Sequence, residues 1–246
     1  MRKNIFEITY KLSFIITMVL FLAACDKNNE TEPDNNKPET VFTVSINGTI
    51  NHSTYTKGQN GTIIFNRFPA TVDEFKVAQQ MVGGEPHGAL ALELMAAEMY
   101  RRDRNKGTQC IALCNVKANS GDIQLNRWKD LFNNNDQYYA RPYQVAAFLE
   151  GADPDNDYTP NEPYTIEVRV SDAVSYMQET MLYNSTVITL EVLTKGKDSG
   201  AEKVEVIKPG KCVDFPNGST YFLVQNCPGL YSQVKQIFDP SWNKLK

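Results

Sequence analysis

Four acidic side chains in one short stretch of the chain could bind a hard cation. Asp153, Asp155, Asp157 and Glu162 present carboxylate oxygens at near-alternate positions, and the carbonyl group of Thr159 lies between them. Calcium takes six to eight oxygen ligands, and a loop with this spacing can supply several of them. The stretch is therefore a candidate calcium site, and calcium is the one cofactor that the sequence suggests.

The same stretch also fits a purely structural connection. An EF-hand loop has a glycine at its sixth position and an acid at its twelfth, where this chain has Tyr158 and Tyr164. Pro154, Pro160 and Pro163 stiffen the path. Prolines and Asx turns favour a rigid connection between a helix and a strand, and this is the simpler interpretation.

Aromatic residues between positions 128 and 148 could stack on a ligand. Trp128, Tyr138, Tyr139 and Tyr143 are the candidate binding residues, because an aromatic ring has an apolar face that can cover a sugar or a peptide. The alternative is that the cluster packs the helices against the sheet, since large aromatic side chains dominate protein cores.

Familiar catalytic and phosphate-binding motifs are missing from the sequence. It contains no Gly-x-Ser-x-Gly elbow, no His-Glu-x-x-His pair and no phosphate-binding loop with its lysine. The two histidines are His52 and His87. His87 follows Pro86 in a glycine-rich turn, where it could act as a general base or help to bind an anion at a helix N-terminus. The simpler interpretation is an ordinary polar residue in the first turn of a helix.

The cysteines after position 25 fall into two pairs. Cys110 and Cys114 are four residues apart in an apolar stretch, so they should share a helix face and pack as small hydrophobic side chains. Cys212 and Cys227 flank a hairpin that is expected to turn at residues 217–218. Pairing centred on that turn does not place the two opposite each other, so the sequence leaves a disulfide between them open.

The first 24 residues are typical of a signal peptide. The basic residues Arg2, Lys3 and Lys11 lead into an apolar run that ends at Ala23 and Ala24. The run has about 13 residues, too few for a helix that crosses a bilayer. We therefore expect residues 1–24 to be removed.

Cys25 follows the small residues, and residues 22–25 resemble the lipobox of bacterial lipoproteins. That resemblance implies that Cys25 is lipidated and becomes the mature N-terminus. Several acyl chains give stable membrane attachment, whereas a single chain binds only reversibly. The expected location is the cell envelope, with the lipid anchored in the outer membrane. The membrane face is left open.

A polar segment separates this anchor from the rest of the chain. Residues 26–40 contain no large apolar side chain, so residues 25–40 are expected to form a lipidated, disordered tether. Cleavage removes three of the 25 basic residues and one of the 29 acidic residues, which leaves 22 against 28 and a formal charge of −6. A net acidic protein is a poor partner for nucleic acid.

Residues 41–246 are predicted to form a single α+β domain. The mostly helical first half should pack on an antiparallel β-sheet formed largely by the second half. Helices are expected at residues 71–82, 86–101, 110–116, 125–132 and 142–149. Thr71 followed by Glu74 is a capping box that marks the start of the first of them. Strands are expected at residues 41–46, 62–65, 165–170, 186–193, 203–207 and 220–224.

Residues 151–165 resemble the signature of an uncharacterised domain family of exported, Bacteroidetes-type lipoproteins from gut bacteria. Residues 68–75, the apolar helix that ends at Tyr100 and Arg101, and residues 198–206 resemble further parts of that family. The resemblance covers roughly residues 66–240, and it implies no activity, substrate or cofactor.

These observations indicate a membrane-anchored envelope lipoprotein whose domain is a non-catalytic binding or interaction module. The expected partners are the membrane, through Cys25, and a glycan or an envelope protein. The alternative is an envelope hydrolase that uses an unrecognised pair of carboxylates from the acidic stretch. A deep pocket lined by two acidic side chains within about 5 to 10 Å of each other would favour it.

Overall fold

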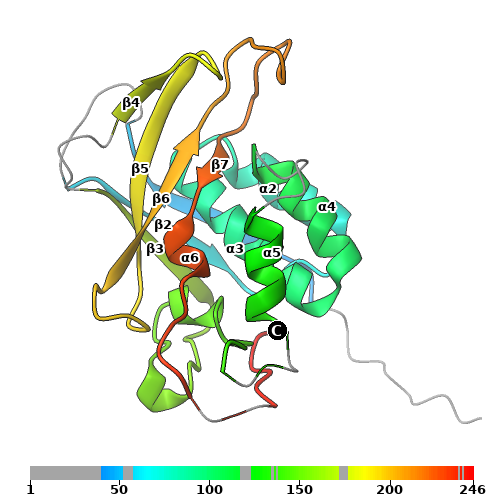
Figure 1. Ribbon diagram of the computed structural model, residues 1–246, viewed down its shortest axis with the longest axis vertical. Coiled ribbons are helices and arrows are strands. Elements are labelled where there is room, and N and C mark those ends of the chain that lie inside the picture. Colours follow the sequence, from blue (N-terminus) through cyan, green and yellow to red (C-terminus); the bar gives the residue numbers. More distant parts are fainter. Residues whose placement is uncertain are drawn as a thin grey trace, which may run out of the picture. The chain divides into compact units, whose positions relative to one another are not determined.

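The chain folds into a seven-stranded antiparallel sheet with a layer of helices against it (Figure 1), which confirms the predicted α+β class. The computed structural model describes residues 40–51, 58–116, 123–133, 136, 138–171, 177–237, 239 and 241–246. The residues from Val41 to Lys246 group as one unit. The predicted signal peptide, Cys25, all of the tether before Thr40 and His52 lie outside the described residues.

The strands of the sheet are β1 (Val44–Gly48), β2 (Asn60–Phe65), β3 (Tyr164–Val170), β4 (Met177–Thr180), β5 (Ser185–Leu193), β6 (Ala201–Ile207) and β7 (Leu223–Asn226). In β2 and β3, buried side chains alternate with more exposed ones, as a sheet covered on one face requires. The spatial order is β1-β2-β3-β5-β6-β7, and β4 pairs with β5. The sequence did not predict β4.

The helical layer comes mainly from the first half of the chain. Its α-helices are α2 (Val72–Val82), α3 (Pro86–Arg102), α4 (Arg104–Cys114) and α5 (Ile123–Leu131), and the second half adds α6 (Pro228–Tyr231). Two short 3₁₀ helices, η1 (Ala146–Phe148) and η2 (Pro154–Asn156), follow α5. The capping prediction at α2 is confirmed in part. The Thr71 hydroxyl accepts a hydrogen bond of 3.1 Å from the Glu74 amide, but the Glu74 carboxylate accepts from the Ala70 amide rather than from that of Thr71.

Several of the predicted bounds were wrong, among them the first strand, which was expected at residues 41–46 and runs from Val44 to Gly48. The helix expected at residues 110–116 starts six residues earlier, because the Asp103 carboxylate caps it by accepting from the amides of Asn105 and Lys106. The helix expected at residues 142–149 is only a set of turns with η1. The strand expected at residues 220–224 is β7, which starts at Leu223.

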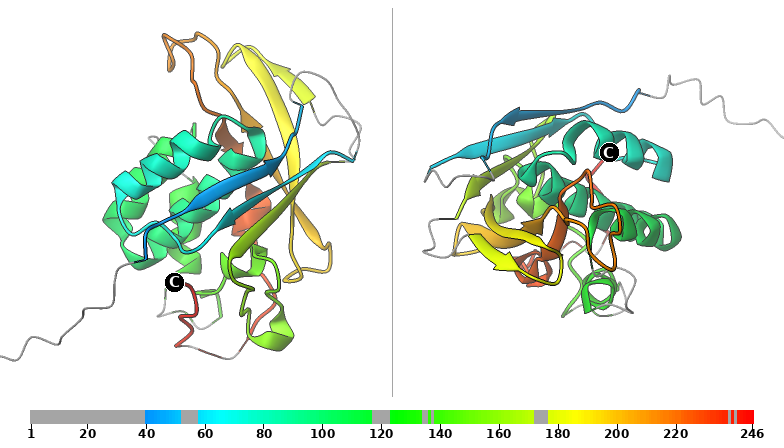
Figure 2. Two further views of the ribbon diagram at one scale, coloured as in Figure 1. Left: turned by 180° about the vertical axis from the view of Figure 1, so that it is seen from behind. Right: turned by 90° about the horizontal axis from the view of Figure 1, so that it is seen from above.

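Helix α3 lies at the centre of the domain, between α2, α4 and α5 on one side and the sheet on the other (Figures 1 and 2). Every residue from Pro86 to Tyr100 is buried, as expected for a helix that is apolar almost all round. Its two acidic residues, Glu93 and Glu98, are fully buried as well. Each of them needs polar partners, because an unpaired buried carboxylate is costly.

Two segments far apart in the sequence meet at one end of the domain. Residues 138–163 and the chain after α6 gather there, as Figure 1 and the left view of Figure 2 show. Gln144 joins them, because its Nε2 donates to the carbonyl groups of Leu230 (2.8 Å) and Ser232 (2.9 Å). Arg141 adds a hydrogen bond of 3.2 Å from its Nε to the carbonyl group of Val234.

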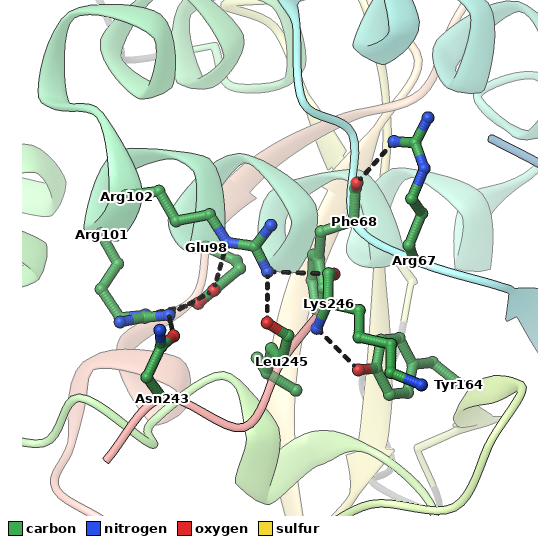
Figure 3. Close-up of polar contacts among 9 residues, drawn as sticks. All are labelled: Arg67, Phe68, Glu98, Arg101, Arg102, Tyr164, Asn243, Leu245 and Lys246. Atoms are coloured by element: carbon green, nitrogen blue, oxygen red, sulfur yellow. Dashed lines mark hydrogen bonds and ion pairs between the residues drawn. The ribbon is translucent and has the colours of Figure 1, made fainter. Parts of the chain in front are cut away.

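Buried Glu98 organises the C-terminal part of the described chain (Figure 3). Its carboxylate accepts hydrogen bonds of 2.7–2.8 Å from the guanidinium groups of Arg101 and Arg102. Arg102 then donates through Nη2 to the carbonyl groups of Leu245 (3.2 Å) and Lys246 (3.0 Å). One buried carboxylate therefore positions the two arginines, and Arg102 holds residues 245–246 against α3.

Candidate functional site

The acidic stretch at residues 153–162 forms a fastened loop around η2. The Asp153 carboxylate caps η2 by accepting a hydrogen bond of 2.9 Å from the Asp155 amide, and the Asn156 side chain closes a capping box. The backbone of Asp157 and Tyr158 is left-handed, with φ of 53° and 51°. These features match the structural interpretation, in which proline and Asx turns shape the connection.

Three of the four candidate calcium ligands pair with different lysines. Asp153 lies 3.6 Å from the Lys195 ammonium group, and Asp157 and Glu162 pair with two further lysines. No group of three or more Asp, Glu, His or Cys side chains in the described part of the chain is arranged to hold a metal ion. The geometry favours a rigid connection here, and calcium binding stays an untested prediction.

The aromatic cluster divides into a buried pair and an exposed pair. Trp128 and Tyr143 are buried, stacked on the rings of Phe132 (5.5 Å) and Tyr158 (5.0 Å), so they belong to the core. Tyr138 and Tyr139 are 82% and 61% exposed. Of the four candidate binding residues, only these two can reach a ligand.

A cleft of about 390 Å³ opens beside Tyr139. This volume falls within the range of roughly 300–1,000 Å³ that ligand sites occupy. Polar side chains of Arg127, Asp130 and Asp136 line it from the α5 side, together with Tyr139. Another part of its wall is formed by Tyr231, Ser232 and Gln233, which follow β7 about ninety residues later in the sequence.

Hydrogen bonds fasten the loop that carries Tyr139. The Gln233 Nε2 donates to the carbonyl groups of Tyr138 (3.2 Å) and Tyr139 (3.1 Å). The Asp136 carboxylate accepts from the amides of the same two tyrosines. The cleft wall is thus held in place without a ligand, which lowers the entropy that binding would cost.

The side chains of the cleft can contact a ligand rich in hydroxyl groups. Arg127 offers donors, and Asp130 offers acceptors. A hydroxyl group both donates and accepts, so it can use both kinds of partner. The Tyr139 ring adds an apolar face beside them. Sequence reasoning missed Tyr231, Ser232 and Gln233, since no local motif marks them.

A second, larger depression of about 530 Å³ lies beside the Gly151 turn. It is lined by two carboxylates, Glu150 and Glu167, and by the polar side chains of Asn161, Thr194 and Lys195. Two acidic side chains in one depression are part of what the hydrolase alternative requires, but Glu150 and Glu167 lie outside the acidic stretch at residues 153–162, from which the pair was expected.

His87 is the second residue of α3, in the first turn as predicted, but it is fully buried rather than an ordinary surface residue. Neither ring nitrogen has a hydrogen-bond partner of normal geometry among the described residues. A Cβ atom added at Gly61 would stand 2.4 Å from the imidazole, so β2 covers the ring. Burial lowers the pKa of His87, against an opposing contribution from the backbone of Asn47.

We expect His87 to make the fold less stable in mild acid. An unfolded histidine takes up a proton near pH 6.5, whereas the folded chain resists it because the pKa is lowered. The free energy of unfolding should therefore fall as the pH drops from about 7.5 towards 5. The measurement is urea unfolding across this pH range. It is made in a His52→Gln background, in which His87 is the only remaining histidine.

The matched variant for this experiment is His87→Leu in the same background. The free energy of unfolding of this variant should fall less as the pH drops, because the variant has no imidazole at position 87 to take up a proton on unfolding. The carboxyl groups are the same in both chains, so their contribution cancels in the comparison. Identical slopes for the two chains would show that His87 titrates normally.

The thiols follow the sequence prediction in part. Cys110 and Cys114 are buried on α4, and burial raises the pKa of the Cys110 thiol to about 12, so both behave as small apolar side chains. No disulfide joins Cys212 to Cys227 in the described structure. Cys227 is buried against Glu93 on α3, whereas Cys212 packs near Phe215 in the loop before β7.

Comparisons with known proteins place the chain in a family without assigning it an activity. The family described as Domain of unknown function (DUF6935) matches residues 67–237, more than half of the chain. No curated protein and no solved structure matches it. In the described residues, no helix is long and apolar enough to cross a membrane.

Proposed function

We propose that this chain, which belongs to the DUF6935 family of domains of unknown function, is a non-catalytic binding module of the cell envelope that holds a glycan in the cleft beside Tyr139. The observation that carries the proposal is the cleft itself, where an exposed aromatic ring on a fastened loop stands among polar side chains. This composition suits a sugar, whose ring has apolar faces and whose edge carries hydroxyl groups.

The membrane anchor is the second part of the proposal. Residues 22–25 carry the lipobox pattern, and a polar tether follows Cys25. We expect the lipidated chain to sediment with outer membranes and Cys25→Ala to be released from them. Equal membrane attachment of the variant would contradict anchoring through Cys25.

Glycan binding is tested by thermal melting and calorimetry on the purified full chain. The probes are cello-, xylo-, malto- and N-acetylglucosamine oligosaccharides. A ligand that binds only the folded state raises the melting midpoint, so one of these sugars should raise it. Tyr139→Ala should weaken that sugar's affinity by about tenfold or more, since an aromatic anchor carries much of the binding energy.

The matched control is Tyr138→Ala. Tyr138 is the neighbouring residue and is even more exposed, yet its side chain does not line the cleft. It should leave the affinity unchanged. If no oligosaccharide binds, the glycan proposal fails, and an envelope protein becomes the ligand class to examine.

The hydrolase remains the second candidate because Glu150 and Glu167 line the larger depression. The same experiment separates the two functions. Cleavage of an oligosaccharide during the incubation would favour the hydrolase, whereas binding without any product supports the binding module.

A further inference from the structure

The wall of the cleft formed by residues 231–233 includes an aromatic ring, Tyr231, that is held by buried neighbours. Tyr231 lines the cleft and is half-buried. Its hydroxyl group lies 2.6 Å from the Cys227 Sγ. Its ring meets the Trp128 ring edge to face, with centroids 4.9 Å apart and an interplanar angle of 85°. The hydroxyl group and the ring of Tyr231 are therefore each held by a buried residue.

A single buried carboxyl group lies behind both of these contacts. The Glu93 Oε1 accepts a hydrogen bond of 3.2 Å from the Trp128 indole and lies 3.9 Å from the Cys227 Sγ. The Cys114 Sγ approaches the other oxygen at 3.5 Å. Glu93 stands in the middle of α3 and is fully buried. The support for Tyr231 is thus built on the most buried helix of the domain.

This cluster has polar groups where core packing alone would place apolar ones. Burying a carboxyl group and a phenol is costly unless both are hydrogen-bonded. This arrangement fixes the Tyr231 ring before any ligand binds. A rigid aromatic surface loses little conformational entropy on binding, and this raises affinity.

We propose that Tyr231 is the fixed stacking surface for a six-membered sugar ring in the cleft, and that Cys227 and Glu93 are positioning residues that hold it. The inference rests on the proposed glycan-binding function and adds a specific role for this wall. Tyr139 covers the ligand from the exposed loop, and Tyr231 supports it from the core side. The ligand class is an oligosaccharide with pyranose rings rather than a peptide.

The test measures the affinity of the full chain for the oligosaccharides named above, for four variants at this wall. Tyr231→Ala should weaken binding by about tenfold or more, because it removes the stacking surface. Tyr231→Phe and Cys227→Ala keep the ring but release it, and each should weaken binding by about three- to tenfold. Cys227→Ser restores a hydrogen-bonding group and should bind within about twofold of the wild type.

The structural control is Tyr158→Phe. Tyr158 is also a buried tyrosine, and its hydroxyl group donates to the carbonyl group of Lys235 at 2.8 Å, away from the cleft. Its loss should lower the melting midpoint without changing the affinity. A general loss of stability at Tyr231 is thereby separated from a loss of ligand positioning.

The outcomes distinguish this inference from the function on which it rests. Tenfold weaker binding by Tyr139→Ala together with unchanged affinity in Tyr231→Phe and Cys227→Ala would keep the glycan site and overturn the role of Tyr231. Failure of Cys227→Ser to recover affinity would overturn the positioning role of Cys227. If the wild type binds none of the oligosaccharides, both proposals fall.

Discussion

Replacing Gly107 by alanine is expected to lower the free energy of unfolding by at least about 3 kcal/mol, a large part of the stability of an ordinary domain. Helix α4 folds back on α3 directly after Asp103, and Gly107 lies at the closest approach. A Cβ atom added there would stand 2.0 Å from the Tyr100 Cα and 2.2 Å from the Tyr100 amide nitrogen. These are backbone atoms of a buried helix, so α3 would have to shift against the sheet.

The matched control for Gly107→Ala is Gly84→Ala. Gly84 lies in the turn between α2 and α3, and a Cβ atom added to it meets no heavy atom within 4 Å among the described residues. Its φ is not positive, so alanine should be tolerated or slightly stabilising, because it restricts the unfolded chain. Urea unfolding of both variants decides the point. A Gly107→Ala chain within about 1 kcal/mol of the wild type would show that α3 and α4 are less tightly joined than described.

Replacing Glu98 by alanine is expected to destabilise the domain by about 3 kcal/mol and to release residues 242–246. The carboxylate is fully buried and is the shared acceptor of Arg101 and Arg102. Its removal leaves two guanidinium groups near the core without their anionic partner. Arg102 would then no longer be held where it contacts residues 245–246 (Figure 3).

Two measurements check the Glu98 prediction. Urea unfolding gives the loss of stability, and hydrogen exchange gives the protection of the amides of residues 242–246, which should fall in the variant. The control is Lys76→Ala, which breaks an exposed pair with Asp73 on α2 and should change neither quantity measurably. Unchanged protection of residues 242–246 in Glu98→Ala would show that the arginines need no buried anion to hold them.

The two clefts suit different functions because their polar groups differ. The cleft beside Tyr139 combines an aromatic ring with donors and acceptors on fastened segments, which suits recognition. The larger depression combines Glu150 and Glu167 with a lysine, which suits acid and base chemistry. Binding of an oligosaccharide without product formation would therefore assign the function to the cleft beside Tyr139, whereas cleavage would assign it to the larger depression.

Features that depend on neighbours in the sequence were predictable. The Thr71 cap placed the start of α2, and the all-round apolar pattern of residues 86–101 indicated a central, buried helix. Period-two alternation located β3 and β5 to within one residue. In each case the signal comes from residues two to four positions apart, because backbone hydrogen bonds and side-chain periodicity act over that distance.

The bounds of helices were predicted less well where individual side chains, rather than the periodic pattern, decide where the helix starts or whether it forms. The Asp103 cap starts α4 at Arg104, in a polar stretch that has no apolar periodicity. Residues 142–149 have helical spacing, but Arg141 and Gln144 tie this segment to the chain after α6, and only η1 forms. Contacts with a distant segment decided the local conformation there.

The sequence by itself determined the α+β class and the membership of Tyr139 in an aromatic group, because composition and periodicity are local properties. Only the tertiary structure decided that Tyr139 is exposed while Trp128 and Tyr143 are buried. It alone placed Tyr231 in the same cleft as Tyr139, and Cys227 beside Glu93 from 134 positions away in the chain. The physical reason is that burial depends on which elements pack together, and this packing is set by the whole core rather than by any one segment.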